Sequence, residues 1–132
     1  MEHQHILVVE DTAEIRSLIA DMLTDEGYTV ECVCNGAEAL AAVERDAPAL
    51  VLLDLHMPVL DGWEFSRALT ARALRIPIIV LTAATNAARY TKELGAVGCI
   101  RKPFALMDLL HTVEQAYRIS HLPDVDIHRS PA

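Results

Sequence analysis

The chain has 132 residues, which allows one domain of ordinary size and hardly a second. Hydrophobic residues make up 52% of it and charged residues 23%, which is typical of a globular protein and excludes intrinsic disorder. The net charge of −8 is uneven, since residues 1–64 hold 14 acidic and 2 basic side chains, whereas residues 65–132 hold 5 and 9. The acidic half disfavours direct binding of nucleic acid and favours cations or basic partners, although solvated helix faces alone would produce the same excess.

The apolar stretches are too short to span a bilayer, and the amino terminus lacks the basic segment of a secretory signal. The cysteines Cys32, Cys34 and Cys99 are an odd number without CxxC spacing, which fits reduced thiols. We therefore expect a cytoplasmic protein that does not contact a membrane. Cys32 and Cys34 are expected to share one strand face, and we predict that all these thiols pack in the core rather than perform redox chemistry.

Strands and helices are predicted to alternate along the chain. Short segments that are apolar or rich in strand-forming residues predict strands at 5–9, 28–34, 49–53, 77–81 and 98–101. Apolar residues at helical spacing predict helices at 15–23, 37–45, 63–73, 84–94 and 106–117. Gly27 and Gly95 are predicted to end the first and the fourth helix, and Leu106 begins the apolar stripe of the last one.

This alternation predicts an α/β fold. Strands that are apolar throughout are buried on both faces, which indicates a parallel sheet with helices on each side. Because crossovers are right-handed, we expect a flavodoxin-like doubly wound (βα)5 sandwich with strand order 2-1-3-4-5. Residues 1–118 would form this domain. Residues 119–132 lack periodicity, and we expect a flexible C-terminal tail or the start of a linker there, with a single-domain protein favoured over an excised one.

Polar side chains follow four of the predicted strands. Ligands of such a sheet bind beyond the carboxyl ends of its strands, where Glu10, Asp11, Asp54, Thr82 and Lys102 are expected. Clustered carboxylates repel one another, and Mg²⁺ would relieve that repulsion. The ammonium and the hydroxyl suit a phosphoryl group. A single strand-end Asp is more often a helix cap, but agreement among four strand ends predicts a small Mg²⁺-dependent phosphoryl site.

These residues carry a resemblance to a known family. The motifs are Glu10-Asp11, Asp54-Leu55-His56-Met57-Pro58 with Asp61-Gly62, Leu81-Thr82-Ala83 and Lys102-Pro103-Phe104. In this order they resemble the CheY-like receiver domain of two-component response regulators. The resemblance covers residues 5 to about 118, and the ordered set of motifs is highly specific for the family.

The resemblance implies a phosphoacceptor and a set of metal ligands. Asp54 would accept a phosphoryl group from the phosphohistidine of a sensor kinase or a histidine phosphotransfer protein. Asp11, Asp54 and the backbone carbonyl of His56 would bind Mg²⁺ directly, and Glu10 would bind it through a water. His56 is therefore expected to act through its backbone rather than as a general base.

The resemblance also implies the residues that hold the transferred group. Thr82, the backbone amide of Ala83 and Lys102 would bind its oxygens. The bond between Lys102 and Pro103 is often cis in the family, which would aim the lysine into the pocket. The aspartyl phosphate would hydrolyse readily, so we expect self-catalysed transfer and autodephosphorylation but no other enzymatic activity.

Two departures from the family pattern concern the output of the switch. Cys99 occupies the position of the usual aromatic residue three places before the lysine. A small thiol cannot make the inward and outward movement of that ring, so we expect the coupling to Thr82 to differ from the family pattern. Residues 82–95 are about two residues fewer than usual, and with Tyr90 and Leu94 as their large apolar residues we expect weak anchoring of the fourth helix. These departures motivate an alternative: an interaction module that works without phosphorylation.

The sequence also bears on partners and on other classes of enzyme. The phosphodonor is expected to dock around Ile15 and the loop after Lys102, and the downstream partner is either a separate protein or a missing output domain. A haloacid-dehalogenase-type phosphatase needs a second Asp two residues after the first, where His56 stands. The motifs GxGxxG, GxxxxGK[ST] and GxSxG are absent, which excludes the corresponding dinucleotide, P-loop and hydrolase sites.

Overall fold

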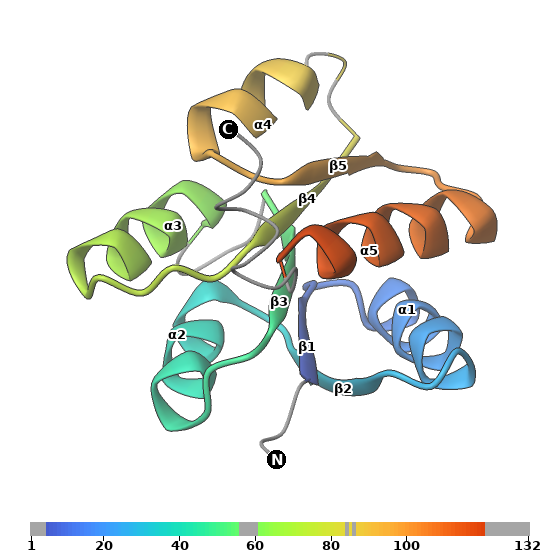
Figure 1. The fold of residues 1–132 in the computed structure, drawn as a ribbon, viewed down its shortest axis with the longest axis horizontal. Coiled ribbons are helices and arrows are strands. Elements are labelled where there is room, and N and C mark those ends of the chain that lie inside the picture. The colour runs from blue at the N-terminus through green and yellow to red at the C-terminus, as the bar shows by residue number, and fades with distance from the viewer. Residues whose placement is uncertain (1–4, 56–60, 84, 86, 121–132) are drawn as a thin grey trace, which may run out of the picture.

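Five short segments form the strands of one parallel sheet in the computed structural model, which describes residues 5–55, 61–83, 85 and 87–120 (Figure 1). The strands are β1 (His5–Val9), β2 (Thr29–Val33), β3 (Leu50–Asp54), β4 (Ile78–Thr82) and β5 (Gly98–Arg101). Their order is β2-β1-β3-β4-β5, and every neighbouring pair is parallel. The predicted flavodoxin-like sheet is therefore confirmed.

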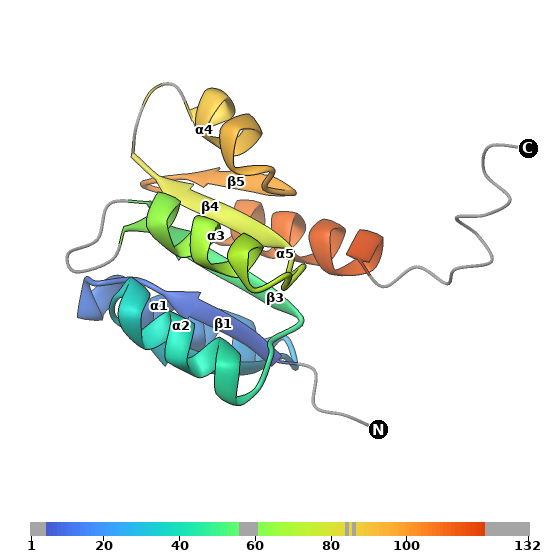
Figure 2. The same ribbon diagram turned by 90° about the vertical axis from the view of Figure 1, so that its left-hand side faces the viewer.

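Helices cover both faces of the sheet. They are α1 (Ala13–Asp25), α2 (Gly36–Arg45), α3 (Gly62–Ala71), α4 (Ala87–Leu94) and α5 (Leu106–Ser120). α1 and α5 pack on one face, and α2, α3 and α4 pack on the other, as the two views of the ribbon show (Figures 1 and 2). The predicted boundary of the domain at residue 118 falls in the last turn of α5, and residues 121–132 lie outside the described residues.

The inner strands of the sheet correspond to the apolar segments of the sequence. Every residue of β1, β3 and β4 is buried, because helices cover both of their faces. Leu53 contributes to the core beneath α2 and α3, whereas its neighbour Leu52 contributes to the core beneath α1 and α5. The sheet thus carries a separate hydrophobic core on each face, and it holds the ends of the inner strands rigidly at one edge.

The helix ends show which local signals could be read from the sequence. Gly27 and Gly95 have φ values of 97° and 68°, so the predicted stops take the left-handed conformation that glycine adopts without strain. α3 begins with a capping box between Asp61 and Glu64. It ends at Ala71, two residues before the predicted end, because Ala73 takes a left-handed φ of 57° and terminates the helix.

Two predictions of core packing are wrong. Cys32 is exposed and Cys34 is only half-buried, because β2 is an edge strand and Cys34 lies beyond its end. Leu106 is 44% exposed, because it is the first residue of α5 and precedes the turns that pack on the sheet. The buried stripe of that helix is instead formed by Leu109, Val113 and Ala116.

Candidate functional site

The carboxyl ends of the strands bring polar side chains to one edge of the sheet. Asp54 is the last residue of β3 and Thr82 the last residue of β4. Glu10 comes directly after β1, and Lys102 comes directly after β5. Because the strands are parallel and adjacent, their ends lie next to one another at the edge where ligands of such sheets bind.

Three carboxylates form an acidic cluster at this edge. One ligand oxygen each of Glu10, Asp11 and Asp54 lies within 4.8 Å of the other two. Glu10 is fully buried and Asp54 is 4% exposed, whereas Asp11 is exposed. Burial removes hydration from carboxylates that already repel one another, so the cluster favours any cation that can reach it. The exposed carboxylate of Asp11 leaves such a cation a route from solvent.

Lys102 supplies part of that positive charge. Its Nζ lies 2.9 Å from Glu10 Oε1 and 3.5 Å from Asp54 Oδ2, and 19% of its side chain is exposed. Its backbone N–H donates to the carbonyl of Thr82 at 2.9 Å, which joins the end of β5 to the end of β4. The peptide bond to Pro103 is cis, as the resemblance implied. One ammonium against three carboxylates leaves the pocket negative.

Arg16 holds the segment that carries Glu10, and the sequence reasoning missed it. Its Nη1 donates to the Glu10 carbonyl at 2.8 Å, and the Thr12 amide donates to Glu10 Oε2 at 3.2 Å. The Glu10 amide donates to the carbonyl of Val33 in β2 at 3.2 Å. One feature of the sequence could have pointed to Arg16, since it is one of only two arginines or lysines among residues 1–64.

The close approach of β3 and α3 explains a glycine in the Asp61-Gly62 motif. The Gly62 amide donates to the Leu55 carbonyl at 3.2 Å, which closes the connection that follows Asp54. A Cβ on Gly62 would lie 2.8 Å from Leu55 Cδ2 and 3.1 Å from Leu55 Cα, so a larger residue would push against β3. His56 lies outside the described residues, and the role of its carbonyl stays a prediction.

Thr82 and Cys99 lie on the same face of the sheet. Thr82 is 1% exposed, and Ala83, which follows it, is exposed. Cys99 is half-buried against the core beneath α2, α3 and α4, and it pairs with Val80, two residues before Thr82 on β4. The thiol thus stands behind the threonine, where the family pattern has an aromatic ring.

The donor set of the acidic cluster fits Mg²⁺. This ion takes carboxylate oxygens, keeps several of its waters and binds phosphate oxygens beside one or two carboxylates. Glu10, Asp11 and Asp54 supply such oxygens close together, and no thiol or imidazole of the described residues joins them. The site can therefore hold a hard cation and a phosphate beside Asp54, with the ammonium of Lys102 3.5 Å from the Asp54 carboxylate.

Comparisons with known proteins agree with this geometry. The family model described as response regulator receiver domain matches residues 6–114. Response regulator MprA of Mycobacterium ulcerans is 39% identical over 121 residues, a match that covers 90% of this chain and 52% of MprA. The chain spans about half the length of the curated relatives it matches.

Solved structures show the same fold. The chemotaxis response regulator CheY4 of Vibrio cholerae is 33% identical with a TM-score of 0.80, and the match covers 87% of this chain and 99% of CheY4. The receiver domain of NtrX from Brucella abortus is 32% identical with a TM-score of 0.79, and the match covers 86% of this chain and 98% of that domain.

Proposed function

The chain belongs to the family of response regulator receiver domains, and we propose that Asp54 is the residue on which it accepts a phosphoryl group. The family and the fold expected from the sequence are thereby confirmed. The observation that carries the proposal is the position of Asp54. Its buried carboxylate ends an inner strand, belongs to the acidic cluster and lies 3.5 Å from the ammonium of Lys102.

The proposed step is a transfer from phosphohistidine to Asp54. A carboxylate oxygen of Asp54 forms a bond to phosphorus as the phosphorus–nitrogen bond of the donor breaks, and the imidazole leaves with that electron pair. Receiver domains in general interact with sensor kinases and downstream effectors. For this chain we place the donor, a sensor kinase or a histidine phosphotransfer protein, on the side of α1 near Ile15, beside the loop after Lys102.

The chain's own residues prepare and stabilise this transfer. Receiver domains in general use Mg²⁺ at their acidic pocket. Here Asp11, Asp54 and the His56 carbonyl would hold the ion directly, and Glu10 would hold it through a water. When bound, Mg²⁺ offsets the repulsion between the carboxylates and the incoming phosphoryl oxygens.

The remaining site residues bind the product. Lys102, the Thr82 hydroxyl and the Ala83 amide would bind the phosphoryl oxygens on Asp54, where charge-assisted hydrogen bonds are strongest. Water then hydrolyses the mixed anhydride and restores the carboxylate. We propose that this self-catalysed transfer and hydrolysis are the only reactions of the chain.

Compartment and downstream partner belong to the same proposal. Among the described residues no helix is long and apolar enough to cross a membrane. Cys32, Cys34 and Cys99 are free thiols, which supports placement in the cytoplasm. We propose that the phosphorylated chain acts on a separate protein or on a further domain, and not on nucleic acid directly.

Acetyl phosphate with Mg²⁺ tests the acceptor. Intact mass should show one phosphate adduct on the wild type and none on Asp54→Asn, and Asp11→Asn should slow the reaction because it removes a metal ligand. An adduct on both the wild type and Asp54→Asn, or on neither, would contradict the proposal.

The alternative of an interaction module that works without phosphorylation is not favoured, because the acidic cluster and Lys102 are in place. It can be separated from the receiver by beryllofluoride, a mimic of the phosphoryl group, added with Mg²⁺. The proposal expects amide chemical shifts to change beyond the pocket, into β5 and α4, whereas changes limited to the pocket would favour the alternative.

A further inference from the structure

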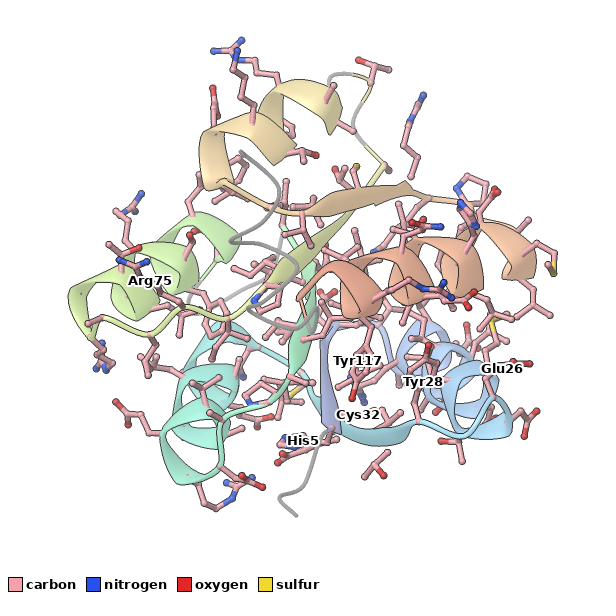
Figure 3. The ribbon with its side chains drawn as sticks, in the orientation of Figure 1. His5, Glu26, Tyr28, Cys32, Arg75 and Tyr117 are labelled. Atoms are coloured by element: carbon pink, nitrogen blue, oxygen red, sulfur yellow. The ribbon has the colours of Figure 1, made fainter. Side chains whose placement is uncertain are left out.

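A second cluster of ionisable groups lies at the amino end of the sheet, opposite to the acidic cluster. It consists of His5 from β1, Glu31 from β2, and Arg45 and Asp46 from the end of α2. Figure 3 shows His5 at the start of β1, between α2 and β2. A cavity of about 180 Å³ beside it is lined by His5, Thr29, Val30, Glu31 and Asp46.

His5 is a buried polar side chain with an unused nitrogen. The residue is 5% exposed, and its Nε2 makes no hydrogen bond with any residue that the structure describes. Most buried polar groups have a partner, because a buried group without one loses its hydration and gains nothing in return. A buried nitrogen that lacks a partner and lines a cavity indicates that a ligand binds in the cavity and supplies the missing partner.

The distance between His5 and Glu31 matches that between two ligands of one metal ion. Nε2 lies 3.5 Å from Glu31 Oε1, which is too long for a good hydrogen bond. Two ligand atoms about 2.0–2.1 Å from one tetrahedral ion lie roughly 3.3 Å apart, close to that separation. On the other side of the ring, Nδ1 lies 3.9 Å from Asp46 Oδ2, which is beyond hydrogen-bond distance, so Asp46 contributes a nearby negative charge.

The second oxygen of Glu31 is held as well. Arg45 Nη2 binds Glu31 Oε2, so the carboxylate is oriented with Oε1 toward the imidazole. The side chains of Glu31 and Asp46 are 32% and 54% exposed, which leaves an entry path from solvent to the buried ring. The two carboxylates outweigh the single guanidinium, so the cavity remains attractive to a cation.

We propose that His5 Nε2 and Glu31 Oε1 bind one divalent transition-metal ion of the zinc type, with water at its remaining positions. Arg45 orients the carboxylate of Glu31, and the negative charge of Asp46 favours a cation beside the ring. An imidazole nitrogen beside a carboxylate suits zinc, whereas Mg²⁺ prefers oxygen ligands, so the two ends of the sheet select different ions. The bound ion joins β1 to the edge strand β2. The proposal does not depend on phosphorylation at Asp54.

Titration of the untagged protein with Zn²⁺ in excess Mg²⁺ tests the site, with calorimetry and thermal unfolding as measurements. The wild type should bind one ion here and unfold at a higher temperature with it, since a ligand of the native state stabilises that state. His5→Gln and Glu31→Gln should each lose this ion. Asp46→Asn should weaken its binding by less than these variants do, because it removes a nearby, partly exposed negative charge and no ligand atom.

Matched variants assign the ion. His111→Gln changes an exposed histidine on α5, Cys34→Ser removes a thiol near the end of β2, and His3→Gln changes a histidine outside the described residues; all should bind zinc as the wild type does. The proposal would be overturned if Glu31→Gln bound zinc as tightly as the wild type does, or if any of these control variants lost the zinc ion. Because Glu31 is partly exposed on an edge strand, this variant decides the matter even if His5→Gln fails to fold.

Discussion

The inner and the edge strands of the sheet have different surroundings. β1, β3 and β4 are buried along their whole length, whereas β2 and β5 each keep exposed or half-buried residues. The carboxylates of the acidic cluster follow or end inner strands, and Cys99, which departs from the family pattern, lies on an edge strand. The buried centre of the sheet therefore holds the carboxylates, and the residue that departs from the family pattern lies at its margin.

The same contrast holds for the helices above one face. α3 packs Phe65 and Leu69 fully into the core, whereas α4 buries only Ala87 completely among its residues. Tyr90 anchors α4 through an edge-to-face contact with Trp63, with ring centroids 5.2 Å apart. α4 is therefore held by partly exposed contacts, which contribute less than full burial does.

Truncation of one aromatic residue in each helix gives the largest expected difference. Phe65→Ala should lower the free energy of unfolding by about 3–5 kcal/mol, because it leaves a cavity in a closed core. Tyr90→Ala should cost roughly 1–2 kcal/mol, since the ring is half-exposed and solvent can fill its place. Urea unfolding measures both. Equal losses would show that α4 is as firmly anchored as α3.

Lys102 is the site residue that could break the comparison, because it follows the edge strand β5. Lys102→Met should slow phosphorylation by acetyl phosphate about 10²–10³-fold, the usual effect of removing one charged donor at a developing anion. Lys92→Met, which changes the only other lysine, on the surface of α4, is the matched control. A rate within a few-fold of wild type would place the essential charge elsewhere.

Replacing Arg16 tests whether the carboxylates at the ends of the inner strands depend on a hydrogen bond from a side chain of α1. Arg16→Ala should weaken Mg²⁺ binding by about tenfold, because the Glu10 carbonyl loses its 2.8 Å hydrogen bond and the segment with Asp11 loosens. Phosphorylation at saturating Mg²⁺ should change little. The control is Arg67→Ala, an exposed arginine on α3. Unchanged or tighter Mg²⁺ binding would show that the arginine mainly repels the ion.

The sequence was most informative where burial is complete. Apolar runs such as residues 49–53 and 77–81 predicted inner strands within about a residue, and their ends located Asp54 and Thr82. Side chains that reach across the fold could not be located in this way. Arg16 contacts a carbonyl six residues away through its long side chain, and no periodicity marks such a contact.

The wrong predictions concern the edge strand β2 and the end of helix α3. Alternation along a strand predicts which residues share a face but not whether the strand lies at the edge of the sheet, so Cys32 was wrongly placed in the core. The early end of α3 depends on a left-handed alanine, a conformation that sequence rarely signals outside glycine and asparagine. These errors lie where tertiary packing, rather than local pattern, decides the outcome.

The smallest expected effect concerns Cys34, the thiol at the end of the edge strand β2. Its Sγ donates to Glu38 Oε1 at 3.3 Å, and this hydrogen bond to a carboxylate raises the pKa of the thiol. Less thiolate forms at a given pH, so Cys34 should react slowly with iodoacetamide near pH 8. Glu38→Gln removes the carboxylate and should speed the reaction, as measured with Cys32 and Cys99 replaced by serine.

The same hydrogen bond gives the edge a pH dependence of known sign. Because the pKa of the Cys34 thiol is higher in the folded than in the unfolded chain, the stability from this bond is present below the ordinary thiol pKa and is lost as the pH rises through the raised value. Glu44→Gln, which changes an exposed glutamate of α2 paired with Arg72, should leave the alkylation rate unchanged. If both glutamate variants sped alkylation equally, the cause would be the general acidity of this edge rather than the bond to Glu38.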